Sequence, residues 1–95
     1  MKLPAVYVMA NRYRGTIYIG VTSNLPSRVS QHRLGLIDGF TKKYALTSLV
    51  DFEPFATMEL AIRREKQLKE WKREWKLALV EQTNPCWNDL FESLM

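Results

Sequence analysis

Apolar and polar residues alternate along this chain in short runs that predict strands first and helices later. Two apolar, β-prone runs, at 5–10 and 16–21, flank a polar segment that ends in Gly15, a residue able to supply a positive φ. Two strands joined by so short a segment predict an antiparallel hairpin. A third such run, at 46–52, is closed off by Pro54 and predicts a third strand.

Capping signals and three- to four-residue apolar spacings predict the helices. Asn24 is a good N-cap and Pro26 suits a first helical turn, so we expect a helix over 25–33 that stops at Gly35. The rest should form a loop, a long helix capped by Thr57, a second helix or bent continuation of it, and a short closing helix, over 36–43, 57–71, 73–81 and 87–94. This order predicts an α+β fold with a three-stranded sheet.

Composition narrows the class of protein. The 95 residues, 46% of them hydrophobic, fit one domain, 1–95, with one modest core. The net charge of +4 favours an anionic partner such as nucleic acid, although many proteins share it by chance. One cysteine and one histidine exclude an internal disulfide and a Cys-rich zinc site. Without a signal peptide or an apolar run near the roughly 20 residues that span a bilayer, we expect a cytoplasmic protein with no membrane association.

Glu65 is the first residue that does not fit a plain core. It falls within an apolar stripe at helical spacing, formed by Met58, Ala61, Ile62, Leu68 and Trp71. A carboxylate that faces a core is costly unless it is paired, hydrogen-bonded or bound to a metal. An ion pair with Lys69, one turn later, is the simpler interpretation.

Four more residues fall where their side chains can converge. Arg28 and His32 stand one turn apart on the first helix, and they supply a guanidinium suited to phosphate oxygens and an imidazole that moves protons near neutral pH. A hairpin turn centred near residues 12–13 would place Tyr7 and Tyr18 side by side on one face. Each pair has an ordinary interpretation, as solvated helix residues or as aromatic packing. Together with Glu65 they form an inventory suited to phosphoryl chemistry.

These residues resemble a known family. The segments Val6-Tyr7-Val8, Tyr18-Ile19-Gly20, Arg28 with His32, and the run 63–69 around Glu65 are similar to the GIY-YIG nuclease superfamily, above all to its small single-domain bacterial members. The resemblance runs from about residue 5 to 90, including the tail 84–90. Ala5-Val6-Tyr7 replaces the Gly-Ile-Tyr half of the signature, and only its tyrosine is expected to act chemically. The family's supporting Asn has no matched position here, with Asn84 and Asn88 candidates by residue type only.

The resemblance implies a three-stranded antiparallel sheet flanked by helices, and a metal-dependent endonuclease that hydrolyses DNA in repair, recombination or processing. It also implies Mg²⁺ or Mn²⁺ held by Glu65 with few other protein ligands, and no small-molecule cofactor. The expected catalytic residues are Tyr7, Tyr18, Arg28, His32 and Glu65. Single-stranded or branched DNA is the expected substrate form, and the oligomeric state stays open.

Basic residues are dense between 63 and 76, interleaved with Trp71 and Trp75. We expect the tryptophans to pack in the core and the basic face to contact DNA backbone. The predicted nucleic-acid contacts are Lys42, Lys43, Arg63, Lys66, Lys69, Lys72 and Arg73. Two rival functions remain, a catalytically inactive nucleic-acid-binding module of the same fold and a protein-interaction domain. Metal-dependent cleavage separates the first from a nuclease, and DNA binding at low salt separates the second.

Overall fold

A computed structural model describes residues 3–37 and 39–94 of the chain. Its sheet has three antiparallel strands in the order β2-β1-β3, formed by Ala5–Ala10 (β1), Ile17–Thr22 (β2) and Ser48–Pro54 (β3). The helices are α1 (Leu25–Arg33), α2 (Phe40–Lys43), α3 (Met58–Lys69), α4 (Arg73–Thr83) and a final 3₁₀ turn, η1 (Phe91–Leu94). The predicted α+β fold with a three-stranded antiparallel sheet flanked by helices is therefore confirmed.

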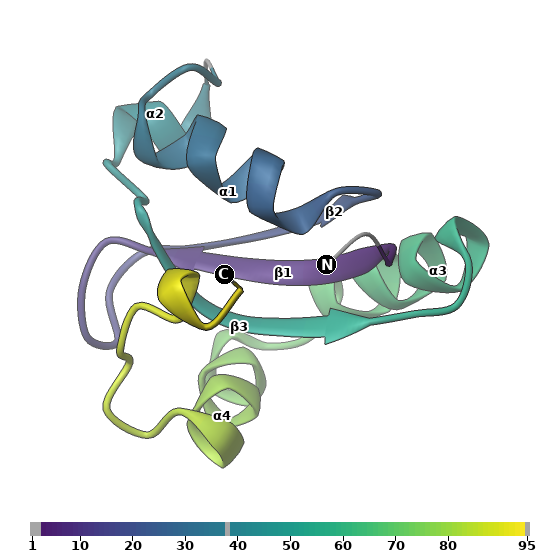
Figure 1. Cartoon of the computed structure of the whole chain (residues 1–95). Coiled ribbons are helices and arrows are strands. Elements are labelled where there is room, and N and C mark those ends of the chain that lie inside the picture. The colour runs from purple at the N-terminus through teal and green to yellow at the C-terminus, as the bar shows by residue number, and fades with distance from the viewer. Residues whose placement is uncertain (1–2, 38, 95) are drawn as a thin grey trace.

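The central strand, β1, is buried on both faces because helices cover both sides of the sheet. Figure 1 shows α1 and α2 on one side, α4 on the other, and α3 at one end. One face of β1 packs Ala5, Tyr7 and Met9 with the buried residues of α1. The other face packs its even-numbered residues with α3 and α4. None of the helices within the described ranges is long and apolar enough to cross a membrane.

The helix that carries Arg28 and His32 has the predicted bounds. The Asn24 side chain accepts a hydrogen bond from the Ser27 amide at 3.3 Å, and Gly35 adopts a left-handed φ of 69° just beyond the last turn. Thr57 caps α3 in the same way through the Leu60 amide at 3.2 Å. Local capping chemistry thus fixes where both helices begin.

Other boundaries differ from the expectation. The predicted loop 36–43 contains the short helix α2. A helix of about one turn leaves too little periodicity in the sequence to be recognised. The third strand lies at Ser48–Pro54 in place of 46–52, so Pro54 is its last residue. The closing helix is shorter than predicted, because only its last four described residues, η1, turn regularly.

The loop between β1 and β2 also corrects a prediction. Arg14, and not Gly15, takes the positive φ, at 50°. Gly15 is required for space, because a Cβ there would lie 2.2 Å from the Asn11 side-chain oxygen. That oxygen accepts a hydrogen bond from the Thr16 amide at 3.0 Å and closes the loop.

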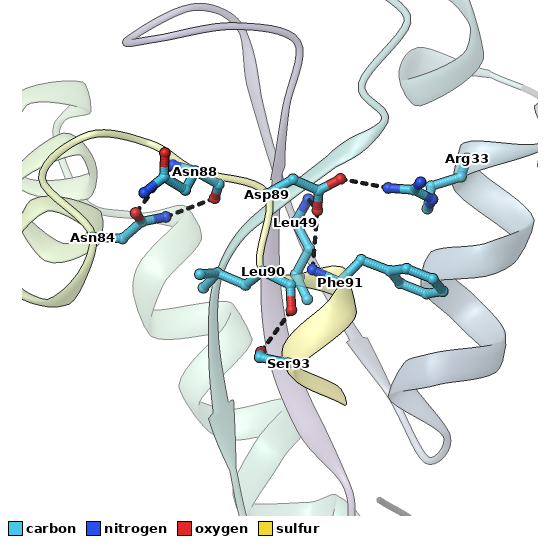
Figure 2. Close-up of polar contacts among 8 residues, drawn as sticks. All are labelled: Arg33, Leu49, Asn84, Asn88, Asp89, Leu90, Phe91 and Ser93. Carbon is cyan, nitrogen blue, oxygen red and sulfur yellow. Dashed lines mark hydrogen bonds and ion pairs between the residues drawn. The ribbon is translucent and has the colours of Figure 1, made fainter. Parts of the chain in front are cut away.

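The C-terminal segment is fastened to the sheet by polar contacts, as Figure 2 shows. Asp89 accepts hydrogen bonds from the amides of Leu49 and Phe91, at 3.1 and 3.0 Å. The same carboxylate pairs with Arg33 at the end of α1. One carboxylate therefore joins η1, β3 and α1 on the face of the sheet that carries Tyr7.

Asp51 is a buried carboxylate on β3 that is only 8% exposed and lies opposite Val8. Burial, together with the nearby charge of Glu53, raises the pKa of Asp51 to about 6. The folded protein therefore holds a proton that the unfolded chain releases at lower pH, so stability falls as pH rises from about 4 to above 6.

We expect Asp51→Asn to raise the free energy of unfolding at pH 7.5 by about 1–3 kcal/mol, because the amide carries no charge to desolvate. The gain should vanish below about pH 4, where the wild-type carboxyl is already protonated. Urea unfolding at several pH values measures both. Glu59→Gln, which alters an 83% exposed carboxylate, is the control and should show no such pH-dependent gain. An unchanged or lowered stability of Asp51→Asn at pH 7.5 would contradict the prediction.

Candidate functional site

Tyr7 and Tyr18 lie on the same face of the sheet, the face covered by α1. Their ring centroids are 6.3 Å apart. Gly20 lies directly opposite Tyr7, and a Cβ at that position would lie 2.5 Å from the Tyr7 hydroxyl and 2.8 Å from Tyr18 Cε2. Only glycine leaves room for the two rings.

The predicted register of the hairpin was wrong by one residue at its turn. Strand partners place the centre between Tyr13 and Arg14, so Tyr18 pairs with Met9 and not with Tyr7. The tyrosines are diagonal neighbours on one face, within reach of aromatic side chains. The space above Gly20 favours this register, because each ring occupies part of the volume that a side chain there would need.

The Tyr7 hydroxyl meets His32 from α1. Its oxygen lies 2.9 Å from His32 Nε2, and His32 Nδ1 lies 3.0 Å from the Thr41 hydroxyl of α2. His32 and Thr41 are 5% and 6% exposed, so the chain of three groups is largely out of water. Sequence reasoning missed Thr41, because no spacing within one element relates it to His32.

Burial favours the neutral forms of Tyr7 and His32. It is the main cause that raises the pKa of Tyr7, and the nearby Tyr18 and Glu65 add to it while Arg28 opposes it. Burial, followed by the charge of Arg28, lowers the pKa of His32. At neutral pH the pair is a phenol beside an uncharged imidazole. The phenol is the stronger acid, so Tyr7 donates to Nε2 and Nδ1–H donates to Thr41.

Arg28 is half-buried, and its charge acts on both Tyr7 and His32. Among the residues described, its guanidinium has neither an ion-pair nor a hydrogen-bond partner. A guanidinium fork so placed can bind an anion without first breaking a contact in the protein.

Glu65 reaches the site from α3. Its side chain is 16% exposed and accepts an ion pair from Lys69, whose Nζ lies 3.3 Å from Oε2. Its charge raises the pKa of Tyr7, and Lys69 Nζ lies 5.7 Å from the centroid of the Tyr18 ring. The structure therefore contains the simpler pairing with Lys69, and Glu65 lies near enough for its charge to act on Tyr7.

The apolar stripe around Glu65 is narrower than predicted. Ala61 and Leu68 are buried, but Ile62 is 37% exposed. Only part of the expected face of α3 packs into the core, through Ala61 and Leu68. Glu65 remains between the two buried positions, so its burial does not depend on Ile62.

A metal site in this region would rest on Glu65. Within the described residues, no group of three or more His, Cys, Asp or Glu side chains could hold a metal ion. One carboxylate fits Mg²⁺ or Mn²⁺, because such cations keep several waters and complete their coordination with substrate phosphate.

The expectation that both tryptophans pack in the core was wrong for Trp75, and the structure also locates the two candidate asparagines. Trp71 is half-buried against the core, but Trp75 is 53% exposed and meets Trp71 edge-on, with centroids 6.1 Å apart. Asn84 is buried and donates to the Val50 and Asn88 carbonyls at 3.0 and 2.9 Å. It ends α4, which lies across the sheet from α1 (Figures 1 and 2), so Asn84 and Asn88 support the tail and not the Tyr7 site.

The predicted nucleic-acid contacts are all exposed and come from α2, α3 and the start of α4: Lys42, Lys43, Arg63, Lys66, Lys69, Lys72 and Arg73. Several of them have partners in the protein. Arg63 pairs with Glu59 at 3.6 Å, Lys69 pairs with Glu65, and Arg73 donates to main-chain carbonyls. Their role in binding stays a prediction.

A hollow of about 290 Å³ opens beside the catalytic candidates. It is lined by Ile17, Tyr18, Ile19, Phe40, Lys69 and Lys76. Phe40 stands 6.4 Å from Tyr18 between ring centroids. A ligand in this hollow would therefore contact Tyr18 directly.

We expect Gly20→Ala to lower the free energy of unfolding by about 1–3 kcal/mol, because the added methyl overlaps two packed rings. The midpoint of urea unfolding measures the loss. Ser23→Ala, an exposed change beyond the end of β2, should shift it by less than about 0.5 kcal/mol. A Gly20→Ala protein as stable as the wild type would show that the rings do not need this space.

Comparison with known proteins agrees with this geometry. The family model of the GIY-YIG catalytic domain matches residues 3–78. The chain is similar to UPF0213 proteins, with 33% identity to one from Staphylococcus haemolyticus over 70% of this chain and 82% of the relative. Identity is 34% to a protein of Haloquadratum walsbyi, over 70% and 75% of the two chains. It is 31% to one of Staphylococcus aureus, over 72% and 83%.

No solved structure matches the chain. The family match spans β1, β2, α1 and α3, the elements that carry the five candidate site residues. This chain therefore belongs to the GIY-YIG nuclease superfamily and carries its catalytic domain.

Proposed function

We propose that this protein is an endonuclease that hydrolyses phosphodiester bonds of DNA with the help of a divalent cation. One observation carries the proposal. The Tyr7 hydroxyl is buried, lies 2.9 Å from an imidazole and is subject to the charges of Arg28 and Glu65. A core tyrosine requires none of these neighbours, whereas phosphodiester hydrolysis needs a proton acceptor, a cation for the phosphate and a metal ligand.

Tyr7 and His32 supply the proton path in this proposal. Burial opposes a free phenolate, so Tyr7 can accept a proton only as its own passes to His32. A water attacks phosphorus, its proton moves to the Tyr7 oxygen, and the Tyr7 proton moves to Nε2. The new oxygen–phosphorus bond forms as the bond to the 3′ oxygen breaks. Thr41 holds the imidazole in the tautomer with Nε2 free to accept.

Arg28 and Tyr18 complete the binding of the phosphate. The Arg28 fork faces the charge that grows on the phosphoryl oxygens during attack. Tyr18 borders the hollow and positions the DNA strand beside Tyr7. Glu65 would hold Mg²⁺ or Mn²⁺, which polarises the phosphate and stabilises the leaving oxygen when bound.

Single-stranded or branched DNA is the proposed substrate form, in repair, recombination or processing. The proposal is supported by the superfamily and by the exposed basic side chains on α2 and α3. The competing function is a catalytically inactive nucleic-acid-binding module of the same fold. Such a module would bind DNA with strong salt dependence and leave it intact with Mg²⁺.

We expect Glu65→Gln to reduce Mg²⁺-dependent cleavage of a labelled oligonucleotide by more than about 100-fold, because it removes the anionic metal ligand and keeps the side chain's shape. Arg28→Gln should lose about 10²–10³-fold through weaker stabilisation of the transition state. Initial rates with Mg²⁺ and with EDTA measure both.

Glu59→Gln is the matched control, because it neutralises an exposed carboxylate on the same helix and should keep the wild-type rate. Circular dichroism and urea unfolding establish that each variant is folded. Full cleavage by folded Glu65→Gln protein would exclude Glu65 as the metal ligand. Wild-type protein that binds DNA but never cleaves it would favour the inactive module.

The cleavage rate should also fall in acid. His32 has a pKa lowered from its usual value near 6.5, so it is neutral at pH 7 and loses its acceptor nitrogen only at more acidic pH. We expect the rate to be level above pH 6.5 and to fall about tenfold per pH unit once His32 is protonated. Circular dichroism over the same pH range separates such a fall from unfolding, because the lowered pKa values of His32 and Glu81 weaken the fold in acid while the raised pKa of Asp51 strengthens it. A rate that stays constant down to pH 4.5 would remove His32 from the proton path.

A further inference from the structure

A second hollow, of about 420 Å³, adjoins the one beside Tyr18. It is lined by Arg12, Arg14, Gly15, Thr16, Ile17, Phe40, Arg73 and Lys76. Three of these residues, Ile17, Phe40 and Lys76, line both hollows. Four lining residues are cationic and none is a carboxylate, although carboxylates are frequent elsewhere in the chain. The site of chemistry thus continues into a positively charged recess.

The four cations are not equivalent. Arg14 is committed to Glu81 through two contacts of 2.6 and 2.7 Å. Arg73 donates from one terminal nitrogen to the carbonyls of Arg14 and Gly15, at 2.8 and 2.7 Å, which fixes the guanidinium and leaves its other N–H groups to a ligand. Arg73 therefore belongs to the wall of the recess as a positioned donor.

Arg12 and Lys76 are the available cations. Arg12 is exposed and has no ion-pair partner within the described part of the chain. Lys76 makes one long contact, 3.4 Å to the Lys69 carbonyl, so most of its donor capacity is unused. Two cations at one recess, with a third fixed in the wall, suit a phosphate.

Phe40 supplies an aromatic surface at the same place. Its side chain is 47% exposed, and it stands between Tyr18, at 6.4 Å, and Tyr44, at 4.8 Å between ring centroids. Exposed aromatic rings beside cations bind unstacked bases, because every base has a flat π face. A phosphate site and a stacking ring together match one nucleotide.

We propose that this recess binds the nucleotide next to the cleaved bond, with its phosphate on Arg12 and Lys76 and its base on Phe40. The inference rests on the proposed nuclease function, since the neighbouring hollow would hold the scissile phosphate. Thr16, which lines the recess, directly precedes β2 and lies about 7 Å from Tyr18 along the extended chain, so the recess is about one nucleotide from Tyr18. The recess thus sets how the strand runs across the site.

Thymidine oligonucleotides test the phosphate contact directly. Fluorescein-labelled TpT has one phosphate and TpTpT has two, and their binding to the wild-type protein is measured by anisotropy at low salt in EDTA. We expect the second phosphate to strengthen binding roughly tenfold or more. In the double variant Arg12→Gln/Lys76→Gln the gain should shrink at least about fivefold, because the recess has lost both available cations while the added base can still stack on Phe40.

The double variant Arg63→Gln/Lys66→Gln is the comparator, because it removes the same charge from α3. It should weaken the binding of both oligonucleotides by the same factor and leave the gain from the second phosphate unchanged. Equal gains in the two double variants would overturn the proposed recess. Circular dichroism confirms that both fold.

The base contact is tested with Phe40→Ala and with TpTpT that lacks one terminal base. Each change alone should weaken binding roughly 5- to 100-fold, and the two together should cost no more than either alone. Additive losses would show that the base does not lie on Phe40 and would overturn that part of the proposal.

These measurements need no metal and no cleavage, so they separate the two proposals. Cleavage of longer DNA without a gain from the second phosphate would overturn the recess and leave the nuclease in place. The gain without any Mg²⁺-dependent cleavage would support the recess as a nucleotide site and overturn the nuclease.

Discussion

The site depends on one packing constraint, the seating of the Tyr7 ring on the central strand over Gly20. The ring is 2% exposed and its hydroxyl would lie 2.5 Å from any Cβ opposite it. Because β1 is buried on both faces, close packing leaves no other position for the Tyr7 ring. Its hydroxyl is thereby held under α1, where it meets His32, and the register that admits the ring also brings Tyr18 onto the same face.

Desolvation gives this arrangement its chemical character. The same burial that packs Tyr7 raises its pKa, and the burial of His32 lowers the pKa of the imidazole. The two groups are pushed toward a neutral phenol and a neutral base in contact, which is the state from which a proton can move in one step. The packing of Tyr7 and the proton path proposed for it therefore depend on the same buried contact, and the charge of Arg28 acts on both groups.

Sequence reasoning predicted what local chemistry determines. The bounds of α1 follow from Asn24 and Gly35, and the turn spacing of Arg28 and His32 follows from the helix itself. It failed where distant segments meet. Thr41 joins the site only because α2 packs on α1. The register of the β1–β2 hairpin depends on the space over Gly20. Asn84 hydrogen-bonds to the main chain of β3 and of the tail. None of these leaves a periodic signal.

The ion pair between Glu65 and Lys69 explains how the fold accommodates a carboxylate that is largely buried. A side chain 16% exposed would be costly as an isolated anion, and Lys69 offsets that cost from the next turn. Lys69 is itself 47% exposed, so it can turn to solvent or to a phosphate at little cost when another cation arrives. The ion pair with Lys69 is therefore compatible with a role of Glu65 as a metal ligand. An exchangeable partner holds the carboxylate of Glu65 near Tyr7, where a divalent cation would need it.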